Sequence, residues 1–296
     1  MPEPTVSLIT VSYFSGDHLS RLMEGLFAQG EDSGALEVVV VCNSAERYSW
    51  AGLRSVRVID SGKNCGFSAA CNRGAARAKG RYLLFCNPDV QMTQEVIRGL
   101  VGVLESRPEL SCVAPFTGGH RIICQPDGTY HEFPGRTCGA CFVVSRETFW
   151  KLGGWDESFF IWWEDFELLV RMTRAGLRYG FAHQIVVPHV NGHSTTGDRH
   201  VTREVLTRVW IASHANYLVK TRGVWSALGW CSVCAAVNLT RAITGRSLKG
   251  RRYYRPSEAV RFALKVLGNA WRLRRYVSFD GDGFPWNRTL ARDTYG

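Results

Sequence analysis

The feature that most constrains the fold of this chain is a series of short, continuous apolar runs. The runs occupy residues 6–12, 37–41, 56–59 and 82–86, and the first three are rich in β-branched residues. Continuous apolar runs of this kind are typical of strands buried on both faces of a parallel sheet. Residues at helical spacing separate them, over 19–26 and over 69–78. The alternation predicts an α/β sheet with right-handed crossovers, whose ligands gather at the carboxyl ends of the strands.

The next part of the chain continues this pattern less regularly. We expect a helix over 93–106, strands near 111–115, 141–145 and 180–188, and an amphipathic helix that ends near residue 175. A polar loop covers 117–137. The composition changes near residue 200, so the sequence predicts an α/β domain over 1–200 and a helical, basic region over 201–296.

The net charge of +10 is unevenly distributed along the chain. Residues 1–199 hold 19 Lys and Arg against 21 Asp and Glu, whereas residues 200–296 hold 17 against 5. Such a basic region indicates either a nucleic acid or an anionic membrane surface as a partner. The chain contains no known nucleic-acid-binding motif, so a nucleic-acid partner is not expected.

Two segments of the basic region favour a membrane surface. Residues 223–240 carry no charge and are bounded by Arg222 and Arg241. This length is at the lower limit for spanning a bilayer, and the polar residues and glycines within it favour a helix that lies in the membrane plane or inserts partly. A second helix, opened by Pro256, has an apolar face flanked by basic residues. The alternative is a tail helix that packs on the α/β domain.

Cysteine usage and the N-terminus bear on the compartment. Ten cysteines are scattered along the chain, several inside apolar runs, and we expect them to be reduced. The two CxxC pairs, at 138/141 and 231/234, are separated by roughly 90 residues, against about 15 to 20 in a zinc ribbon, which argues against zinc. The N-terminus has no basic segment and no cleavage pattern, so we expect no signal peptide and a cytoplasmic protein.

Asp89 is the first candidate for a role in chemistry. It follows the run 82–86 on a turn fixed by Pro88, so its carboxylate is expected to project from the carboxyl edge of the sheet. A hard oxygen ligand at that edge suits Mg²⁺ or Mn²⁺ bridging a diphosphate. The alternative is an ordinary Asn-Pro-Asp turn that caps the next helix.

The segment 64–74 joins an expected strand to an expected helix through glycine and small residues. Such residues let a ligand approach the backbone closely. The segment is not a Walker A loop and lacks the GxGxxG spacing of dinucleotide-binding folds. The alternative is a helix of small residues that packs tightly on the sheet.

The segment 155–167 places carboxylates among large aromatic side chains. Burial beside apolar rings raises the pKa of a carboxyl group, so Glu164 or Asp165 is a candidate general base. Aromatic rings also form walls for the apolar faces of sugars, which makes Trp155, Trp162 and Trp163 candidates for sugar binding. The alternative is a helix N-terminus rich in acids that offset the helix dipole.

Histidines cluster after the last expected strand, at positions 183, 189, 193 and 200. An imidazole from this cluster can complete a metal site begun by Asp89. The alternative is a set of ordinary surface histidines.

Taken in chain order, these segments resemble the family 2 glycosyltransferases, in particular the bacterial rhamnosyltransferase branch. The resemblance covers residues 5–200, and its strength is the ordered set, since each motif is weak alone. The motifs are the strand 6–12, the NxGFxxAxNxG run 64–74, Asn87-Pro88-Asp89, the run 139–146, the GGWDExFF run 153–160, Glu164-Asp165 and the HxxGxS run 189–194.

The resemblance implies a GT-A fold with a Rossmann-like mixed sheet. Under this resemblance Asp89 stands at the DxD-like aspartate of the family and is implied to bind the metal, and His189 matches a later position that is implied to assist it. Asp165 is the implied catalytic base, and Asp156 is implied to hold hydroxyl groups of the acceptor or donor.

The rhamnosyltransferase branch implies dTDP-L-rhamnose as the donor. A membrane-associating region over 201–296 suits a lipid-linked or polysaccharide acceptor in cell-surface glycan assembly. We therefore expect a peripheral protein at the cytoplasmic face of the bacterial inner membrane.

The chain departs from the family pattern at one position. Similar proteins read Val-Asp-Asn after the second strand, and here the Asp is replaced by Cys42. The carboxylate that contacts the base is therefore missing, which gives more weight to neighbouring polar groups. The donor-binding residues expected from the sequence are Thr10, Ser12, Asn43, Asn64, Gly66, Phe67, Asn72, Asn87 and Asp89.

The expected reaction is an inverting transfer in one displacement, with Asp165 as the base and a metal ion that neutralises the leaving diphosphate. Two rival functions remain open. A nucleotidyltransferase more often has a glycine-rich loop with a basic residue after the first strand, which residues 13–16 do not offer. A non-catalytic, membrane-bound scaffold descended from a transferase is supported by Cys42.

Overall fold

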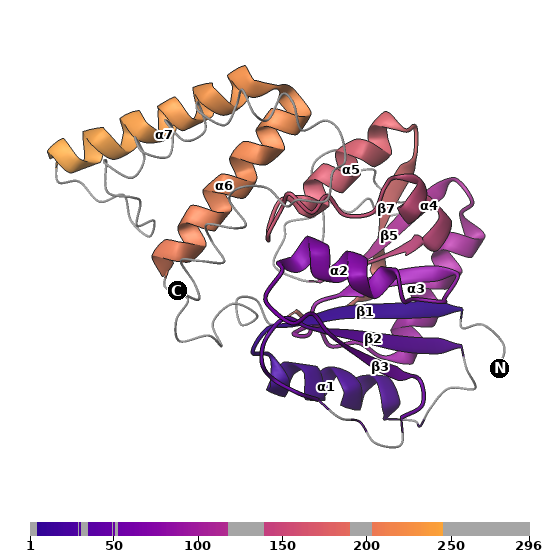
Figure 1. Ribbon diagram of the computed structural model, residues 1–296. Helices are drawn as coiled ribbons and strands as arrows, with labels where there is room; N and C mark the ends of the chain where they lie inside the picture. The colour runs from indigo at the N-terminus through magenta and orange to yellow at the C-terminus, as the bar shows by residue number, and fades with distance from the viewer. Residues whose placement is uncertain are drawn as a thin grey trace.

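A seven-stranded mixed sheet forms the centre of the protein in a computed structural model (Figure 1). The structure describes residues 5–28, 30, 35–48, 50, 53–117, 139–189 and 203–244. The strand order is β3-β2-β1-β4-β6-β5-β7. The strands are β1 (Val6–Ser12), β2 (Leu36–Cys42), β3 (Val56–Asp60), β4 (Tyr82–Cys86), β5 (Leu110–Phe116), β6 (Cys141–Ser145) and β7 (Arg178–Val186).

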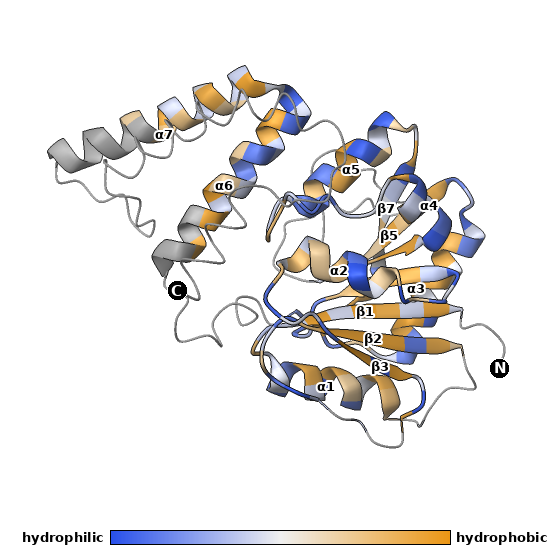
Figure 2. Ribbon diagram, in the orientation of Figure 1, coloured by the Kyte–Doolittle hydropathy of each residue, from blue (hydrophilic) through white to orange (hydrophobic). Residues whose placement is uncertain are grey.

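The first four strands run parallel, and the sheet becomes mixed beyond β4. Strand β6 is antiparallel to both β4 and β5, whereas β5 and β7 are parallel to each other. The strands β1, β2 and β4 are buried along their whole length, as their continuous apolar sequences predict. Figure 2 shows the same property as apolar colouring over much of β1 and β2.

Helices α1 (Gly16–Phe27) and α2 (Phe67–Ala75) lie on opposite sides of the first strands (Figure 1). The buried residues of α1 recur at the expected helical spacing and are Leu19, Leu22, Met23 and Leu26. Gly74 of α2 lies close against the side chains of Ile9 and Val41, so this helix packs tightly on the sheet. The buried face predicted for α1 is confirmed, and the small residues of α2 pack on the sheet as the alternative for this segment describes.

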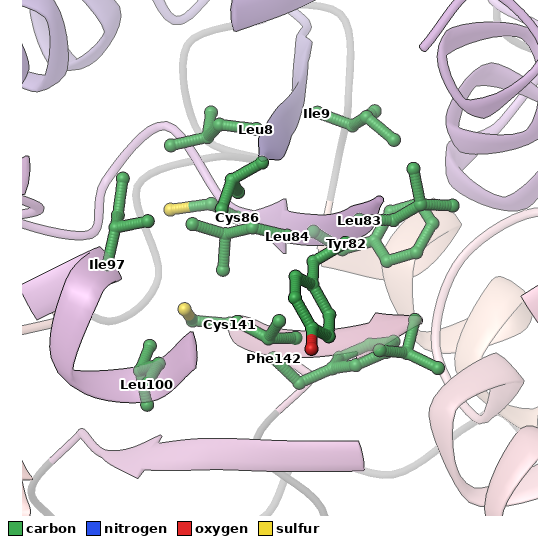
Figure 3. Packing of buried hydrophobic residues seen from close by; sticks show 14 of the residues in the cluster. Leu8, Ile9, Tyr82, Leu83, Leu84, Cys86, Ile97, Leu100, Cys141 and Phe142 are labelled. Atoms are coloured by element: carbon green, nitrogen blue, oxygen red, sulfur yellow. The ribbon is translucent and has the colours of Figure 1, made fainter. Parts of the chain in front are cut away.

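Helix α3 (Gln94–Ser106) follows β4 and covers the strands of the second half. It begins at the expected position because the Thr93 side chain accepts a hydrogen bond from the Val96 amide at 3.3 Å. Figure 3 shows Ile97 and Leu100 of α3 near the side chains of β4 and β6. These residues belong to one continuous hydrophobic core with β1 and β2.

Strand β3 differs from its expected environment. It was expected to be buried on both faces, but it forms the edge of the sheet and most of its residues are exposed or half-buried. Val58, for example, keeps 38% of its surface exposed. The apolar run predicts the strand correctly. It does not predict that β3 is the last strand on this side of the sheet, because strand order cannot be read from one run.

Two short helices of the second half are α4 (Arg146–Lys151) and α5 (Glu164–Arg174). Helix α4, with only 6 residues, was not expected from the sequence. Its first turn is capped by Ser145, whose hydroxyl accepts from the Thr148 amide at 3.0 Å. Helix α5 packs on β7 and is the amphipathic helix that the sequence predicts.

Helices α6 (Arg203–Arg222) and α7 (Val224–Thr244) extend from the sheet domain (Figure 1). They meet at Gly223, whose φ of +88° allows the chain to turn sharply. Helix α6 packs on α5, and α7 packs on α6. No helix in the described part of the chain is long and apolar enough to cross a membrane. The helix expected after Pro256 lies outside the described residues.

Candidate active site

The carboxyl ends of the parallel strands meet at one edge of the sheet. Ser12 at the end of β1 pairs with Cys42 of β2, and Cys42 pairs with Asp60 of β3. Strand β4 ends beside them at Cys86. The residues that follow these strands therefore lie along one edge, as the α/β pattern predicts.

Asp89 lies in a turn just after β4, and the chain after β7 comes beside it. The Gln91 amide donates to the Pro188 carbonyl at 3.0 Å, and Val90 and His189 form an isolated bridge. As a result, His189 Nε2 lies 3.2 Å from Asp89 Oδ1. The expected pairing of these two side chains, which are distant in the sequence, is present in the structure.

The Asp89 carboxylate is completely buried, with 0% of its side chain exposed. Within the described residues, neither of its oxygens accepts a hydrogen bond of acceptable geometry, although the His189 ring is near. A buried carboxylate without donors is costly in free energy unless a cation compensates it. Asp89 therefore has the environment of a residue that binds a cation.

Glu164 opens α5 and turns into the protein. It is buried, and its Oε2 has no hydrogen-bond partner among the described residues. Burial, helped by the charge of Asp165, raises the pKa of Glu164 well above its ordinary value. Burial, followed by the charge of Glu164, raises the pKa of the Cys71 thiol in α2. Glu164 is thus directed towards the α2 side of the core.

Asp165 has a different environment, although it is the next residue. Its Oδ2 lies against the backbone of Gly139, so closely that a methyl group on Gly139 would collide with it. The next residue, Ala140, accepts a hydrogen bond from the Asn87 amide at 2.8 Å. Gly139 and Ala140 therefore connect the Asp165 carboxylate to the Asn87 turn that carries Asp89. This connection places both expected site carboxylates at the same edge of the sheet.

The backbone before α5 is held in an uncommon conformation. Trp162 and Trp163 have φ angles of 69° and 72°, in the left-handed region that non-glycine residues rarely adopt. The Ser213 hydroxyl of α6 donates to the Ile161 carbonyl at 2.8 Å, and the Trp163 ring packs with rings of α6. Helix α6 thereby supports the loop that leads to Asp165. Trp162 is half-buried, and its role in sugar binding stays a prediction.

Trp155 occupies a different place from the expected sugar wall. It is only 1% exposed and packs edge-on against Phe67, Phe85 and Phe142 in the core. A ring without exposed surface cannot line a sugar site in this arrangement. The pattern of aromatic residues among acids does not distinguish a core tryptophan from one that lines a ligand site.

Asp156 forms an ion pair with α6. Its Oδ2 lies 2.5 Å from Lys220 Nζ, and its Oδ1 accepts from the Ser158 amide at 2.9 Å. Burial acts to raise the pKa of Asp156, but Lys220 and the bonds from Ser158 hold it below its ordinary value. The described contacts make Asp156 a link between the loop and α6, and its binding of sugar hydroxyls stays a prediction.

The segment 64–74 supports the loop 154–160 from the side of α2. The Phe67 amide donates to the Phe160 carbonyl at 2.6 Å. Gly66 has φ +86° and lies so close to Phe160 that a side chain would not fit. Asn64 Oδ1 accepts from the Gly66 amide at 3.0 Å. The glycine is therefore needed for close packing between two loops.

Asn72 binds the backbone of Trp155 in both directions. Its Nδ2 donates to the Trp155 carbonyl at 2.9 Å, and its Oδ1 accepts from the Trp155 amide at 2.9 Å. Nδ2 also donates to Glu157 at 2.9 Å. These bonds use the polar atoms of the amide, so the structure gives Asn72 a positioning role; its contact with the donor is untested.

The remaining expected donor-binding residues lie at the ends of β1 and β2. Asn43 is buried and donates to the Gly66 carbonyl at 3.0 Å, while its Oδ1 accepts from Ser61 at 2.9 Å. The Thr10 hydroxyl is buried without a hydrogen-bond partner among the described residues. Ser12 lies 2.8 Å from the hydroxyl of Tyr48. Thr10, Ser12 and Asn43 therefore lie at or near the carboxyl ends of the parallel strands, where the sequence predicts the ligand site.

Several residues of this region were not expected from the sequence, among them Glu46, Tyr48, His214 and Lys220. Glu46 and Tyr48 follow the strand whose Asp is replaced by Cys42, and that replacement is a signal to look for another acid nearby. Gly139, His214 and Lys220 contact site residues only through the fold. No local pattern marks His214 or Lys220, whereas Gly139 opens the run 139–146 of the resemblance.

The comparison with protein families agrees with this geometry. Residues 7–121 match the model described as glycosyl transferase family 2. Solved structures share the fold at low identity. The mannosyltransferase PcManGT from Pyrobaculum calidifontis, in complex with GDP-Man and Mn²⁺, has a TM-score of 0.53 and 15% identity over 99% of this chain and 85% of its own. S. aureus TarS 1-349 in complex with UDP-GlcNAc has a TM-score of 0.56 and 14% identity over 91% and 81%.

Curated relatives are more similar in sequence. The low-salt glycan biosynthesis hexosyltransferase Agl10 of Haloferax volcanii is 28% identical over 207 residues, which are 59% of this chain and 64% of that protein. The N-acetylglucosaminyl-diphospho-decaprenol L-rhamnosyltransferase of Mycobacterium tuberculosis is 24% identical over 250 residues, 64% of this chain and 78% of that protein. The rhamnosyltransferase WbbL of Escherichia coli is 23% identical over 64% of this chain and 84% of its own length.

The mixed sheet and the solved structures that share it show a GT-A-like α/β fold. More particularly, the family match and the named relatives confirm the resemblance to family 2 glycosyltransferases of the rhamnosyltransferase-like branch.

Proposed function

We propose that this chain transfers a sugar from a nucleoside diphosphate donor to an acceptor hydroxyl in glycan biosynthesis. The observation that carries the proposal is the buried Asp89 carboxylate, which accepts no hydrogen bond from the described residues and lies beside His189, on the edge of the sheet that also holds Asp165. A cation-binding acid and a separate candidate base at one strand edge are the two groups that this transfer needs. The family match supports the same reading.

Asp89 and His189 are the residues that would hold a divalent cation. Within the described residues, no group of three or more His, Cys, Asp or Glu side chains gathers as a cation site. A pair still fits Mg²⁺ or Mn²⁺, because these ions are often bound by one or two protein groups together with phosphate oxygens and water. Bound there, the cation would supply positive charge to the departing diphosphate. The solved structure of PcManGT contains Mn²⁺, which supports this part of the proposal.

Asp165 is the proposed general base. It takes the proton from the acceptor hydroxyl while that oxygen forms a bond to the anomeric carbon. The bond from this carbon to the phosphate oxygen breaks, and the nucleoside diphosphate leaves with the electron pair, so the configuration is inverted. Asp165 is better placed than Glu164, because Glu164 is directed into the core and its neutral form is favoured there.

The proposed donor is dTDP-L-rhamnose, and the proposed acceptor is lipid-linked or a growing polysaccharide. Two of the relatives are named rhamnosyltransferases, and one of these names includes a diphospho-decaprenol acceptor.

We further propose that the protein works as a peripheral protein at the cytoplasmic face of the bacterial inner membrane. Trp225 and Val233 of α7 are 82% and 61% exposed, and the region after residue 200 is strongly basic. Exposed apolar residues beside basic ones suit adsorption to an anionic lipid surface.

Calorimetry with dTDP-rhamnose, UDP-sugars and GDP-sugars, with and without Mn²⁺, tests the proposed function. We expect binding of a nucleotide sugar that requires Mn²⁺ and that Asp89→Asn abolishes, because an amide lacks the charge that holds the cation. Asp17→Asn, which removes an exposed carboxylate near the same edge, is the matched control and should bind normally. Absence of binding with every donor would favour a non-catalytic scaffold and contradict the proposal.

A further inference from the structure

Glu46 follows β2 in a loop and is held by a chain of hydroxyl groups. Its Oε2 accepts from the Tyr48 hydroxyl at 2.6 Å and from the Ser44 hydroxyl at 3.2 Å. Because Tyr48 gives its one hydroxyl proton to Glu46, the contact of 2.8 Å between Ser12 and Tyr48 has Ser12 as the donor. The chain Ser12 to Tyr48 to Glu46 therefore fixes one carboxylate oxygen beside the carboxyl end of β1.

The same loop is held from its other side by Arg47. The guanidinium donates to the carbonyls of Ser44 at 3.3 Å and Glu46 at 3.0 Å. It also forms an ion pair with Asp60 at 2.8 Å. Arg47 therefore stabilises the loop backbone while its charge is paired with Asp60. Within the described residues, the Glu46 carboxylate has no ion-pair partner.

The second oxygen of Glu46 faces Gly16, the first residue of α1. A Cβ placed on Gly16 would lie 3.5 Å from Glu46 Oε1 and 3.6 Å from the Tyr48 ring. In the described part of the chain, Oε1 accepts no hydrogen bond that would occupy it. The Tyr48 ring is stacked on Trp50, with 5.5 Å between centroids and 20° between planes. An acceptor oxygen thus lies beside a pair of flat rings.

Cys42 cannot supply the charge that the family pattern places at its position. It is buried, and burial together with the charge of Asp60 raises the pKa of its thiol to about 11. At neutral pH the group is a neutral thiol and a weak acceptor. The charge of Glu46 also contributes to the raised pKa of this thiol, so the two side chains lie close enough to interact.

We propose that Glu46 replaces the missing acid and recognises the base of the nucleotide donor, with Tyr48 as its positioning residue. The inference rests on the proposed function. A carboxylate accepts a hydrogen bond from a ring N–H, which uracil, thymine and guanine present. Cytosine and adenine present an unprotonated ring nitrogen instead, and a carboxylate repels it. Glu46 thereby selects donors whose base carries a ring N–H, and the chain keeps this selection although residue 42 is cysteine.

The test compares the affinities of UDP, dTDP, GDP, CDP and ADP in the presence of Mn²⁺ for the wild type, Glu46→Gln and Asp17→Asn. We expect the wild type to prefer a base with a ring N–H. Glu46→Gln should weaken binding of that nucleotide about 10- to 100-fold, the range for a lost hydrogen bond to a charged group. CDP should bind the variant as well as or better than the wild type, because the Gln amide can donate to the cytosine ring nitrogen. Asp17→Asn should change neither the affinity for the preferred nucleotide nor the affinity for CDP.

Tyr48→Phe keeps the ring but removes the hydroxyl that holds Glu46, so it should reduce the preference without lowering CDP affinity. Circular dichroism of all variants excludes misfolding as a cause. Equal losses for all five nucleotides in Glu46→Gln, or an unchanged preference, would overturn the inference while leaving metal-dependent nucleotide binding intact. Failure of the wild type to bind any nucleotide would overturn the proposed function and the inference with it.

Discussion

The imidazole ring of His214 lies flat against the indole ring of Trp163, with 4.0 Å between ring centroids and 17° between planes. Trp163 directly precedes Glu164 and Asp165 and has a left-handed backbone conformation. His214 belongs to α6, which lies outside the sheet (Figure 1). A residue of the helical region thus supports the start of the helix that carries the proposed base, so α6 contributes to the order of the site.

The first prediction concerns the pH dependence of stability through His214. Burial among aromatic rings, followed by the charge of Arg222, lowers the pKa of His214 to about 4 from an ordinary value of 6.5. Between these two values the unfolded chain binds more protons than the folded one, so the free energy of unfolding falls as pH decreases through this window. His214→Phe keeps a ring and cannot be protonated, so its stability should fall less.

Thermal unfolding followed by circular dichroism between pH of about 7 and about 4 measures this difference. Parallel pH profiles for wild type and His214→Phe would show that protonation of His214 does not affect folding.

The second prediction separates the two adjacent acids of α5. Asp165→Asn should lower the transfer rate by roughly two to four orders of magnitude, because an amide cannot accept the acceptor proton. Donor affinity should barely change. Glu164→Gln should keep a much higher rate, because burial already favours the neutral carboxyl form that Gln resembles.

Single-turnover rates and donor affinities of both variants decide the assignment. A near-normal rate for Asp165→Asn together with a collapsed rate for Glu164→Gln would exchange their roles. Near-normal rates for both would remove this pair of acids from the mechanism.

The third prediction concerns the ion pair between Lys220 and Asp156. Lys220→Met keeps a long apolar chain but leaves the Asp156 carboxylate without its cation. We expect a loss of about 1 to 3 kcal/mol in the free energy of unfolding, since the pair is largely buried and hydrogen-bonded. Urea denaturation at neutral pH measures the loss, and Lys151→Met on the exposed surface of α4 is the control.

The same ion pair has a defined pH dependence. Because the folded chain has a lowered pKa for Asp156, its contribution to stability is present above the ordinary value of 3.8 and is lost as pH falls through the folded value. The difference between wild type and Lys220→Met should therefore shrink in acid. A difference that is constant down to that range would contradict the assigned ion pair.

The fourth prediction concerns the membrane surface. Replacing both Trp225 and Val233 of α7 by Ser should weaken cosedimentation with vesicles that contain anionic lipid, because apolar side chains contribute to adsorption. Trp150→Ser on α4, where the ring is 41% exposed, is the matched control and should cosediment like the wild type. High salt should weaken the attachment only partly. Full-length protein that never binds vesicles at low salt would refute the proposed localisation.

Much of the sheet could be predicted because the signal is local. The continuous apolar runs give β1, β2 and β4, and the spacing of Leu19, Leu22, Met23 and Leu26 gives the buried face of α1. The turn at Pro88 similarly predicts the position of Asp89, since a residue just after a buried strand must lie at the strand edge. Helix α4 was missed because it is short, and the exposure of β3 was missed because edge position depends on strand order.

The sequence by itself thus determined the class of fold and the strand edge where the expected site residues lie, and it predicted that Asp89 and His189 come together there. Only the tertiary structure decided how neighbouring residues divide their roles: Glu164 and Trp155 are buried, Asp165 lies against Gly139, and Asn72 holds the backbone of Trp155. The physical reason is that periodicity is a property of consecutive residues, whereas burial and hydrogen bonding depend on which distant segments come together. Glu46 and His214 acquire their significance in the same way, from Ser12 and Tyr48 in one case and from Trp163 in the other.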